Sequence, residues 1–190
     1  MLQLLQRMRV WLFRRSWTCS RVEIGKDVKF LTPVRITGAG RVVIGEGVTF
    51  GHVKSPLFFS HYILLDARSA NACIQIGSNV IIGNGSSIMA FDSRIQIGTE
   101  CLLGPQTTIV DSDFHPLAAS QRRDKPESRP VKLGKNVTTG FSSFILKGAD
   151  VGDDCFIGAA AVVTKSAPPA QILAGSPARY YPLPSLEVDL

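Results

Sequence analysis

The chain has 190 residues, of which 45% are hydrophobic and 19% are charged. This composition excludes a disordered chain, and no apolar run approaches the roughly 20 residues that a membrane-spanning helix needs. The length suits one domain. We identify no cleavable secretory signal in the sequence. The formal net charge of +6 would suit a nucleic-acid partner, but the repeats described below contain no aromatic-and-basic stacking platform and no nucleic-acid motif. We therefore expect no nucleic-acid partner, and rather an anionic small ligand or an acidic membrane surface.

Residues 1–20 are predicted to form an amphipathic cap helix, in which Leu, Met, Trp and Phe alternate with Gln and Arg. One role for this helix is to cover the exposed end of the repeats that follow, since terminal repeats need a cap. The other is peripheral membrane contact through residues 1–18, because aromatic residues beside arginines suit a headgroup layer. The sequence leaves both roles open.

A seven-residue unit, with an apolar residue, then Ile, Leu or Val two positions on and Gly directly after it, recurs along the rest of the chain. Six copies begin at residues 22, 42, 74, 95, 131 and 149, and from Leu133 to Val163 an inward residue recurs every sixth position. A period of six matches neither a helix nor an isolated hairpin. It fits a solenoid in which each hexad is a short strand plus a corner, with glycine at the bend and three hexads per coil. We predict an all-β solenoid over residues 21–166, with a C-terminal tail at 167–190.

Departures from the period predict excursions. Two extra residues near 38–40 indicate a bulge at a corner, and the long interval from Ile44 to Ile76 favours an additional irregular coil. Residues 113–130 carry almost no repeat and are predicted to form an excursion loop, a kind of loop that is usually functional or disordered. Cys101 and Cys155 occupy the slot that holds valine in other copies, so they are expected in the core and not as ligands.

The hexads, the segment Ile-Val-Asp-Ser-Asp-Phe-His-Pro at 109–116 and the segment Ala-Gly-Ser-Pro-Ala-Arg at 174–179 resemble the hexapeptide-repeat acyltransferases. The layout is most similar to galactoside and maltose O-acetyltransferases and to sugar O-acetyltransferases of surface-polysaccharide gene clusters. The resemblance implies a left-handed parallel β-helix. It also implies a homotrimer, with coenzyme A between neighbouring prisms. The hand comes from the family alone, since parallel crossovers are normally right-handed.

His115 is the candidate catalytic base, because transfer from a thioester to an alcohol needs a group that takes the hydroxyl proton near neutral pH. The resemblance implies this role for the His of an x-His-Pro motif at this place. Asp113, and less so Asp111, could orient the imidazole, although such carboxylates also form turns.

The resemblance implies acetyl-CoA as the acyl donor and no metal. The residues that match its coenzyme A contacts are Gly140, Phe141, Ser142, Ala159, Ala160, Thr164, Lys165 and Arg179, with the last two cations facing phosphates. Thr138 and Thr139 replace the tryptophan and the aliphatic residue that are common in the family, so the wall of the coenzyme A site is expected to differ in shape.

On the acceptor side, Asn84 and Asp92 match positions near the acceptor in galactoside-type enzymes. We expect O-acetylation of a sugar hydroxyl in the cytoplasm, at the inner face of the membrane if the helix binds there. Amino-sugar N-acetylation, serine O-acetylation and a non-catalytic scaffold are the alternatives. A trimeric zinc carbonic anhydrase needs three histidine ligands, and His52, His61 and His115 do not reproduce their spacing.

Overall fold

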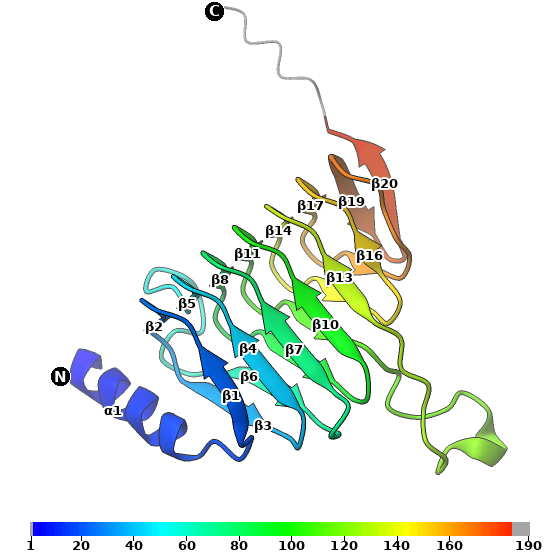
Figure 1. The fold of residues 1–190 in the computed structure, drawn as a ribbon. Coiled ribbons are helices and arrows are strands. Elements are labelled where there is room, and N and C mark those ends of the chain that lie inside the picture. Colours follow the sequence, from blue (N-terminus) through cyan, green and yellow to red (C-terminus); the bar gives the residue numbers. More distant parts are fainter. Residues whose placement is uncertain (1, 184–190) are drawn as a thin grey trace, which may run out of the picture.

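The computed structural model describes residues 2–183 as one helix followed by a stack of β-coils (Figure 1). The helix is α1 (Leu2–Arg15), and a short 3-10 helix spans Ala119–Gln121. Each of six coils contributes one strand, paired in parallel, to each of three sheets, here called A, B and C, and an antiparallel C-terminal hairpin extends sheet B. Sheet A holds β1 (Arg21–Ile24), β4 (Arg41–Ile44), β7 (Cys73–Ile76), β10 (Arg94–Ile97), β13 (Val131–Leu133) and β16 (Asp150–Val151).

The other two sheets complete the prism. Sheet B holds β2 (Lys29–Phe30), β5 (Thr49–Phe50), β8 (Ile81–Ile82), β11 (Leu102–Leu103), β14 (Thr138–Thr139), β17 (Phe156–Ile157), β19 (Gln171–Gly175) and β20 (Ala178–Pro182). Sheet C holds β3 (Val34–Thr37), β6 (Ile63–Ala67), β9 (Ser87–Ala90), β12 (Thr108–Val110), β15 (Phe144–Ile145) and β18 (Val162–Val163). The solenoid prediction is confirmed: the fold is a parallel β-helix with an N-terminal helix and a C-terminal tail. Residues 184–190 of the tail lie outside the described residues.

The predicted inward residues of sheet A form one column. Strand pairing aligns Ile24, Ile44, Ile76, Ile97, Leu133 and Val151 in consecutive coils. Five of them are fully or almost fully buried, whereas Ile24 is 41% exposed because no coil lies beneath the first one. The coils stack so closely that a Cβ on Gly98 would lie 2.2 Å from the carbonyl oxygen of Gly134. Glycine after the inward residue is therefore what allows neighbouring coils to touch at this corner.

The segments between the strands lie at the three corners of the prism. The A–B corner, after the strands of sheet A, consists of tight turns only. The B–C corner carries an excursion at 51–62, and the C–A corner carries the long one between β12 and β13. As a result, irregular segments extend from two of the three corners (Figure 1).

The prediction of an additional coil between Ile44 and Ile76 is wrong. β4 pairs directly with β7, so the interval is a single coil enlarged at two corners. The apolar segment that suggested a coil is divided between two environments. Ile63 and Leu65 fill the core in β6, while Phe58 and Tyr62 pack beneath α1, with the Tyr62 ring 5.3 Å from that of Phe13.

Where the period carries a polar residue, the core supplies its hydrogen bonds. Thr139 is buried, and its hydroxyl lies 2.6 Å from the hydroxyl of Thr107 and accepts the N–H of Gly104 at 2.9 Å. A satisfied hydroxyl costs little, which explains how threonine replaces an aliphatic residue here. Cys101 and Cys155 are buried free thiols, as predicted.

The helix α1 lies at the first-coil end of the prism, with Leu4, Met8 and Leu12 facing outward and Phe13 packed against Tyr62. The buried residue of α1 is Gln6, which donates hydrogen bonds to the carbonyl oxygens of Leu31 and Phe58. The guanidinium of Arg9 donates hydrogen bonds to the carbonyl oxygens of Phe59 and His61. Between residues 2 and 183, no helix has the length and apolarity that would let it cross a membrane.

The column predicts a position-dependent loss of stability. Ile97→Ala removes a fully buried side chain between two coils and should lower the free energy of unfolding by about 2–5 kcal/mol. Ile24→Ala, the same substitution in the same column, should cost clearly less, because Ile24 is partly exposed. Urea unfolding followed by circular dichroism measures both. Equal losses would contradict the stacked core described here.

Candidate functional site

The excursion that carries His115 is anchored at its base by Asp111. This carboxylate is fully buried and accepts the backbone N–H groups of Phe91 and Ser93 at 2.6 and 2.8 Å, and that of Asp92 at 3.3 Å. Burial raises the pKa of Asp111, and the three N–H groups oppose that rise. Asp111 therefore ties the loop to the preceding coil and does not orient the imidazole.

His115 is presented by a strained residue. Phe114 has a φ of 60°, which is uncommon for an aromatic residue, and its ring is held edge-on by Phe91 and covered by the guanidinium of Arg68 at 4.8 Å. The exposed imidazole then lies with Nδ1 at 3.3 Å from the carbonyl oxygen of Arg122. Since a carbonyl only accepts, Nδ1 is the donor in this contact, and in the neutral imidazole Nε2 then keeps its lone pair. That is the tautomer a general base requires.

Asp113 has a different partner from the one predicted. Its carboxylate pairs with Lys147 at 2.8 Å, and Lys147 also pairs with Glu127 at 3.1 Å. Asp113, followed by Glu127, raises the pKa of Lys147. Lys147 thereby links both ends of the excursion to the next coil. The sequence analysis missed Lys147 and Glu127, because nothing in the six-residue period marks which corner residues will face the loop.

An open cavity of about 560 Å³ lies between the excursion and the next coil. His115, Asp113 and Lys147 line it together with Lys125 and other loop residues. Its size is within the range of small-molecule sites, about 300–1,000 Å³. A polar acceptor could enter here and place a hydroxyl near Nε2.

At the B–C corner, three of the predicted coenzyme A contacts are consecutive. A Cβ on Gly140 would lie 2.5 Å from the backbone nitrogen of Ala159, so the two coils meet there backbone to backbone. The N–H groups of Gly140 and Ser142 are taken by the carbonyls of Ile157 and Pro105. Within residues 2–183 no acceptor is found for the N–H of Phe141, which leaves that N–H as the candidate oxyanion donor of this turn.

Ala159 and Ala160 lie on the next turn of the same corner, both exposed, and the N–H of Ala160 binds the carbonyl of Phe141 at 2.8 Å. Thr164, Lys165 and Arg179 line a separate groove of about 570 Å³ beneath the β19–β20 hairpin, together with Tyr180 and Tyr181. The structure thus brings the two predicted phosphate-binding cations into one groove, although they are 14 positions apart.

Asn84 and Asp92 are both engaged within the chain. Asn84 is fully buried, and its carboxamide binds the backbone of His52, Ser55 and Pro56. Any part it plays toward an acceptor is therefore indirect, through the 51–62 excursion that it holds. Asp92 binds Lys125 and Ser69, and Lys125, first among its partners, lowers the pKa of Asp92.

The predicted site residues lie at two different corners of the prism. Gly140, Phe141 and Ala159 belong to the B–C corner, whereas His115 and Lys165 belong to the C–A corner. The cavity at His115 is lined by none of the B–C residues. Among the described residues, no group of three or more His, Cys, Asp or Glu side chains could hold a metal ion.

Comparison with known proteins agrees with the repeat and with the fold. Residues 130–165 match the hexapeptide repeat of succinyl-transferase. This match places the hexapeptide repeat in that part of the chain. It is 31% identical over 128 residues to galactoside O-acetyltransferase of Escherichia coli K12, which covers 67% of the chain and 58% of that protein. It is 30% identical over 86 residues to polysialic acid O-acetyltransferase of Neisseria meningitidis, covering 45% and 40% of the two chains.

Solved structures extend the likeness over most of the fold. A mutant of AntD, an N-acyltransferase of Bacillus cereus in complex with a dTDP-amino sugar and coenzyme A, superposes with a TM-score of 0.66 at 19% identity, covering 85% of this chain and 82% of that one. The fold of this chain is the left-handed parallel β-helix, as the resemblance implied. The chain spans about half the length of the curated relatives it matches.

The Lys147 bridge predicts how firmly the loop is held. Lys147→Gln should raise amide hydrogen exchange across residues 112–128, because both ion pairs that attach the loop to the next coil are lost. Lys135→Gln is the matched control, since Lys135 pairs with Glu100 at 3.2 Å on another corner. Exchange that rises equally in both variants, or in neither, would contradict the anchoring role of Lys147.

Proposed function

We propose that this protein is an acetyl-CoA-dependent O-acetyltransferase that acts on a sugar hydroxyl. The observation that carries the proposal is His115, whose imidazole lines an open cavity with Nδ1 at the Arg122 carbonyl, the contact that leaves Nε2 of the neutral ring as the acceptor of a proton. The names of its sequence relatives, galactoside and polysialic acid O-acetyltransferases, support this choice of acceptor. A role in surface-polysaccharide synthesis is consistent with it.

The proposed reaction is direct transfer without an acyl-enzyme. Nε2 of His115 takes the proton of the acceptor hydroxyl, and the oxygen attacks the acetyl carbonyl of acetyl-CoA. The C–S bond breaks as the C–O bond is completed, and the imidazolium returns the proton to the departing thiolate. Asp113 contributes through its ion pair with Lys147, which holds the loop. Base catalysis of this kind contributes about 10²–10⁴-fold.

The proposed donor site suits a long polyanionic thioester. The close backbone approach at Gly140 and the exposed Ala159 and Ala160 leave room for a pantetheine arm beside the turn. Lys165 and Arg179 line the groove that would take phosphates. The Phe141 N–H would face the developing oxyanion.

We infer a homotrimer from the separation of these groups. A second prism that meets sheet C would bring its own C–A corner to the B–C corner of the first, and so complete a site. Sheet C lies between these two corners, and Leu64, Phe144 and Val162 face outward on it beside Arg35. The exterior of sheet A is instead charged, with Arg41, Arg94, Lys132 and Asp150.

We further infer that the protein works in the cytoplasm at the inner face of the membrane, which it contacts through residues 1–18. The support is the outward apolar face of α1, on which Leu4, Met8, Trp11 and Leu12 are about half exposed or more. In water this face has no partner among the described residues.

The catalytic proposal is tested by His115→Ala. Turnover, measured as release of free thiol from acetyl-CoA with a panel of sugar acceptors, an amino sugar and serine, should fall about 10²–10⁴-fold. Lys135→Ala is the control, because Lys135 is exposed at the A–B corner, which holds none of the proposed site residues, and the rate should stay unchanged. Wild-type turnover by His115→Ala would reject the base, and thiol release with the amino sugar or serine alone would change the acceptor class.

The trimer is tested by introducing a glutamate in place of either of two phenylalanines that are equally exposed. Phe144→Glu on the exterior of sheet C should yield monomers in sedimentation velocity and abolish turnover. Phe156→Glu on the exterior of sheet B should remain trimeric. The two positions are matched, because Phe144 is 42% exposed and Phe156 is 44% exposed. A monomeric wild type, or a trimer that survives Phe144→Glu, would refute this interface.

A further inference from the structure

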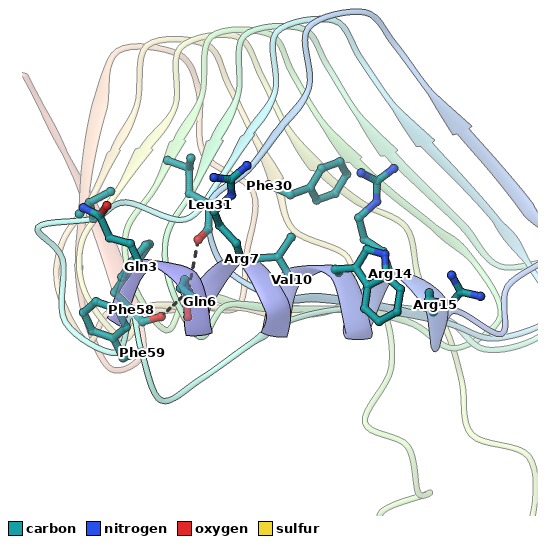
Figure 2. A pocket seen from close by; sticks show the side chains of 12 residues that line it. Gln3, Gln6, Arg7, Val10, Arg14, Arg15, Phe30, Leu31, Phe58 and Phe59 are labelled. Carbon is teal, nitrogen blue, oxygen red and sulfur yellow. Dashed lines mark hydrogen bonds between the residues drawn. The ribbon is translucent and has the colours of Figure 1, made fainter. Parts of the chain in front are cut away.

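A groove runs between α1 and the open end of the first coil. It has a volume of about 690 Å³ and separates the helix from Phe30, Leu31 and the 51–62 excursion. Figure 2 shows the side chains of α1 along one side of it and the first coil on the other. Val53 and Phe58 of the excursion are among the residues that line it.

The floor of the groove is apolar and its rim is cationic. Three arginines line it, and no carboxylate does. The first acidic residue of the whole chain is Glu23. In the described part of the chain, the guanidinium groups of Arg7, Arg14 and Arg15 make neither an ion pair nor a hydrogen bond to another side chain or to a carbonyl.

Two of these arginines are held over aromatic rings. The guanidinium of Arg14 lies 4.8 Å from the centre of the Phe30 ring, and that of Arg15 lies 4.9 Å from the Trp11 ring. This contact fixes a cation above the apolar floor while its N–H edges stay available to an anion. Charge and apolar surface are thus combined within one groove.

The partner that suits both features is an amphiphile with an anionic head and an apolar chain. A nucleic acid would satisfy the arginines but would leave the aliphatic part of the lining, Val10, Leu31 and Val53, without a partner. The outward face of α1, with Leu4, Met8 and Leu12, continues the apolar surface beyond the groove. A face of this kind beside arginines is typical of helices that lie in a membrane interface.

We propose that this groove binds an anionic phospholipid of the bilayer, with an acyl chain against Phe30, Leu31 and Phe58 and its phosphate on Arg7 and Arg14. The proposal deepens the membrane contact inferred above and rests on it. It assigns the groove a ligand class, and it makes binding depend on headgroup charge as well as on the apolar face of α1.

Co-sedimentation of the full chain with vesicles tests the headgroup. Vesicles of phosphatidylcholine and phosphatidylglycerol should bind the protein, and vesicles of phosphatidylcholine alone should bind it weakly. Arg7→Gln/Arg14→Gln should reduce binding to the mixed vesicles about 30-fold, given the usual attraction of each cation to an anionic surface. Arg41→Gln/Arg94→Gln, an equal loss of charge on the exterior of sheet A, should reduce it little.

Fluorescence quenching tests whether a chain enters the groove. In a Trp17→Phe background, Trp11 is the single tryptophan, and phosphatidylglycerol with brominated chains should quench it. Val53→Tyr fills the groove without changing charge, so at equal bound protein it should weaken quenching. Circular dichroism verifies that each variant is folded.

Three results would overturn the proposal: equal binding to both kinds of vesicle, equal loss in the two arginine pairs, or quenching unaffected by Val53→Tyr. Its failure is distinguishable from failure of the acetyl-transfer proposal. His115→Ala should bind vesicles as the wild type does, and Arg7→Gln/Arg14→Gln should turn over an acceptor in solution at the wild-type rate.

Discussion

Burial of one residue in every six, against the same residue of the next coil, is the interaction on which the rest of this structure depends. The column from Ile44 to Val151 is fully dry, and each of its members is paired in register with the next. A coil alone has nothing to bury this surface against, so stability accumulates coil by coil. Because the strands are short, each coil has three corners, and whatever is inserted at a corner leaves the column intact.

Function can therefore be added at corners without cost to the core. The C–A corner holds the loop with His115, anchored by Asp111 from within and by Lys147 from the following coil. The B–C corner holds the 51–62 excursion, which Asn84 fastens to the prism and which Gln6 and Arg9 fasten to α1. One excursion thus serves catalysis in our proposal, and the other joins the solenoid to its terminal helix.

The sequence predicted the fold well, because the six-residue period marks the side chains that point into the core. It failed between Ile44 and Ile76, since apolar residues that pack under a helix look the same as residues that fill a coil. The partners of Asp113, Asn84 and Asp92 could not be predicted, as they depend on how loops fold back across coils. Nor could the orientation of α1, in which a buried glutamine binds the first coil and the excursion.

The central claim is that His115 of one chain acts at the B–C corner of another, and mixed assembly tests it most directly. His115→Ala and Ala159→Trp, each inactive alone, are unfolded together and refolded as mixed trimers. If each site takes His115 from one chain and Ala159 from its neighbour, random assembly restores about one quarter of wild-type turnover. If both residues act within the same chain, the mixture stays inactive, and that result would contradict the account.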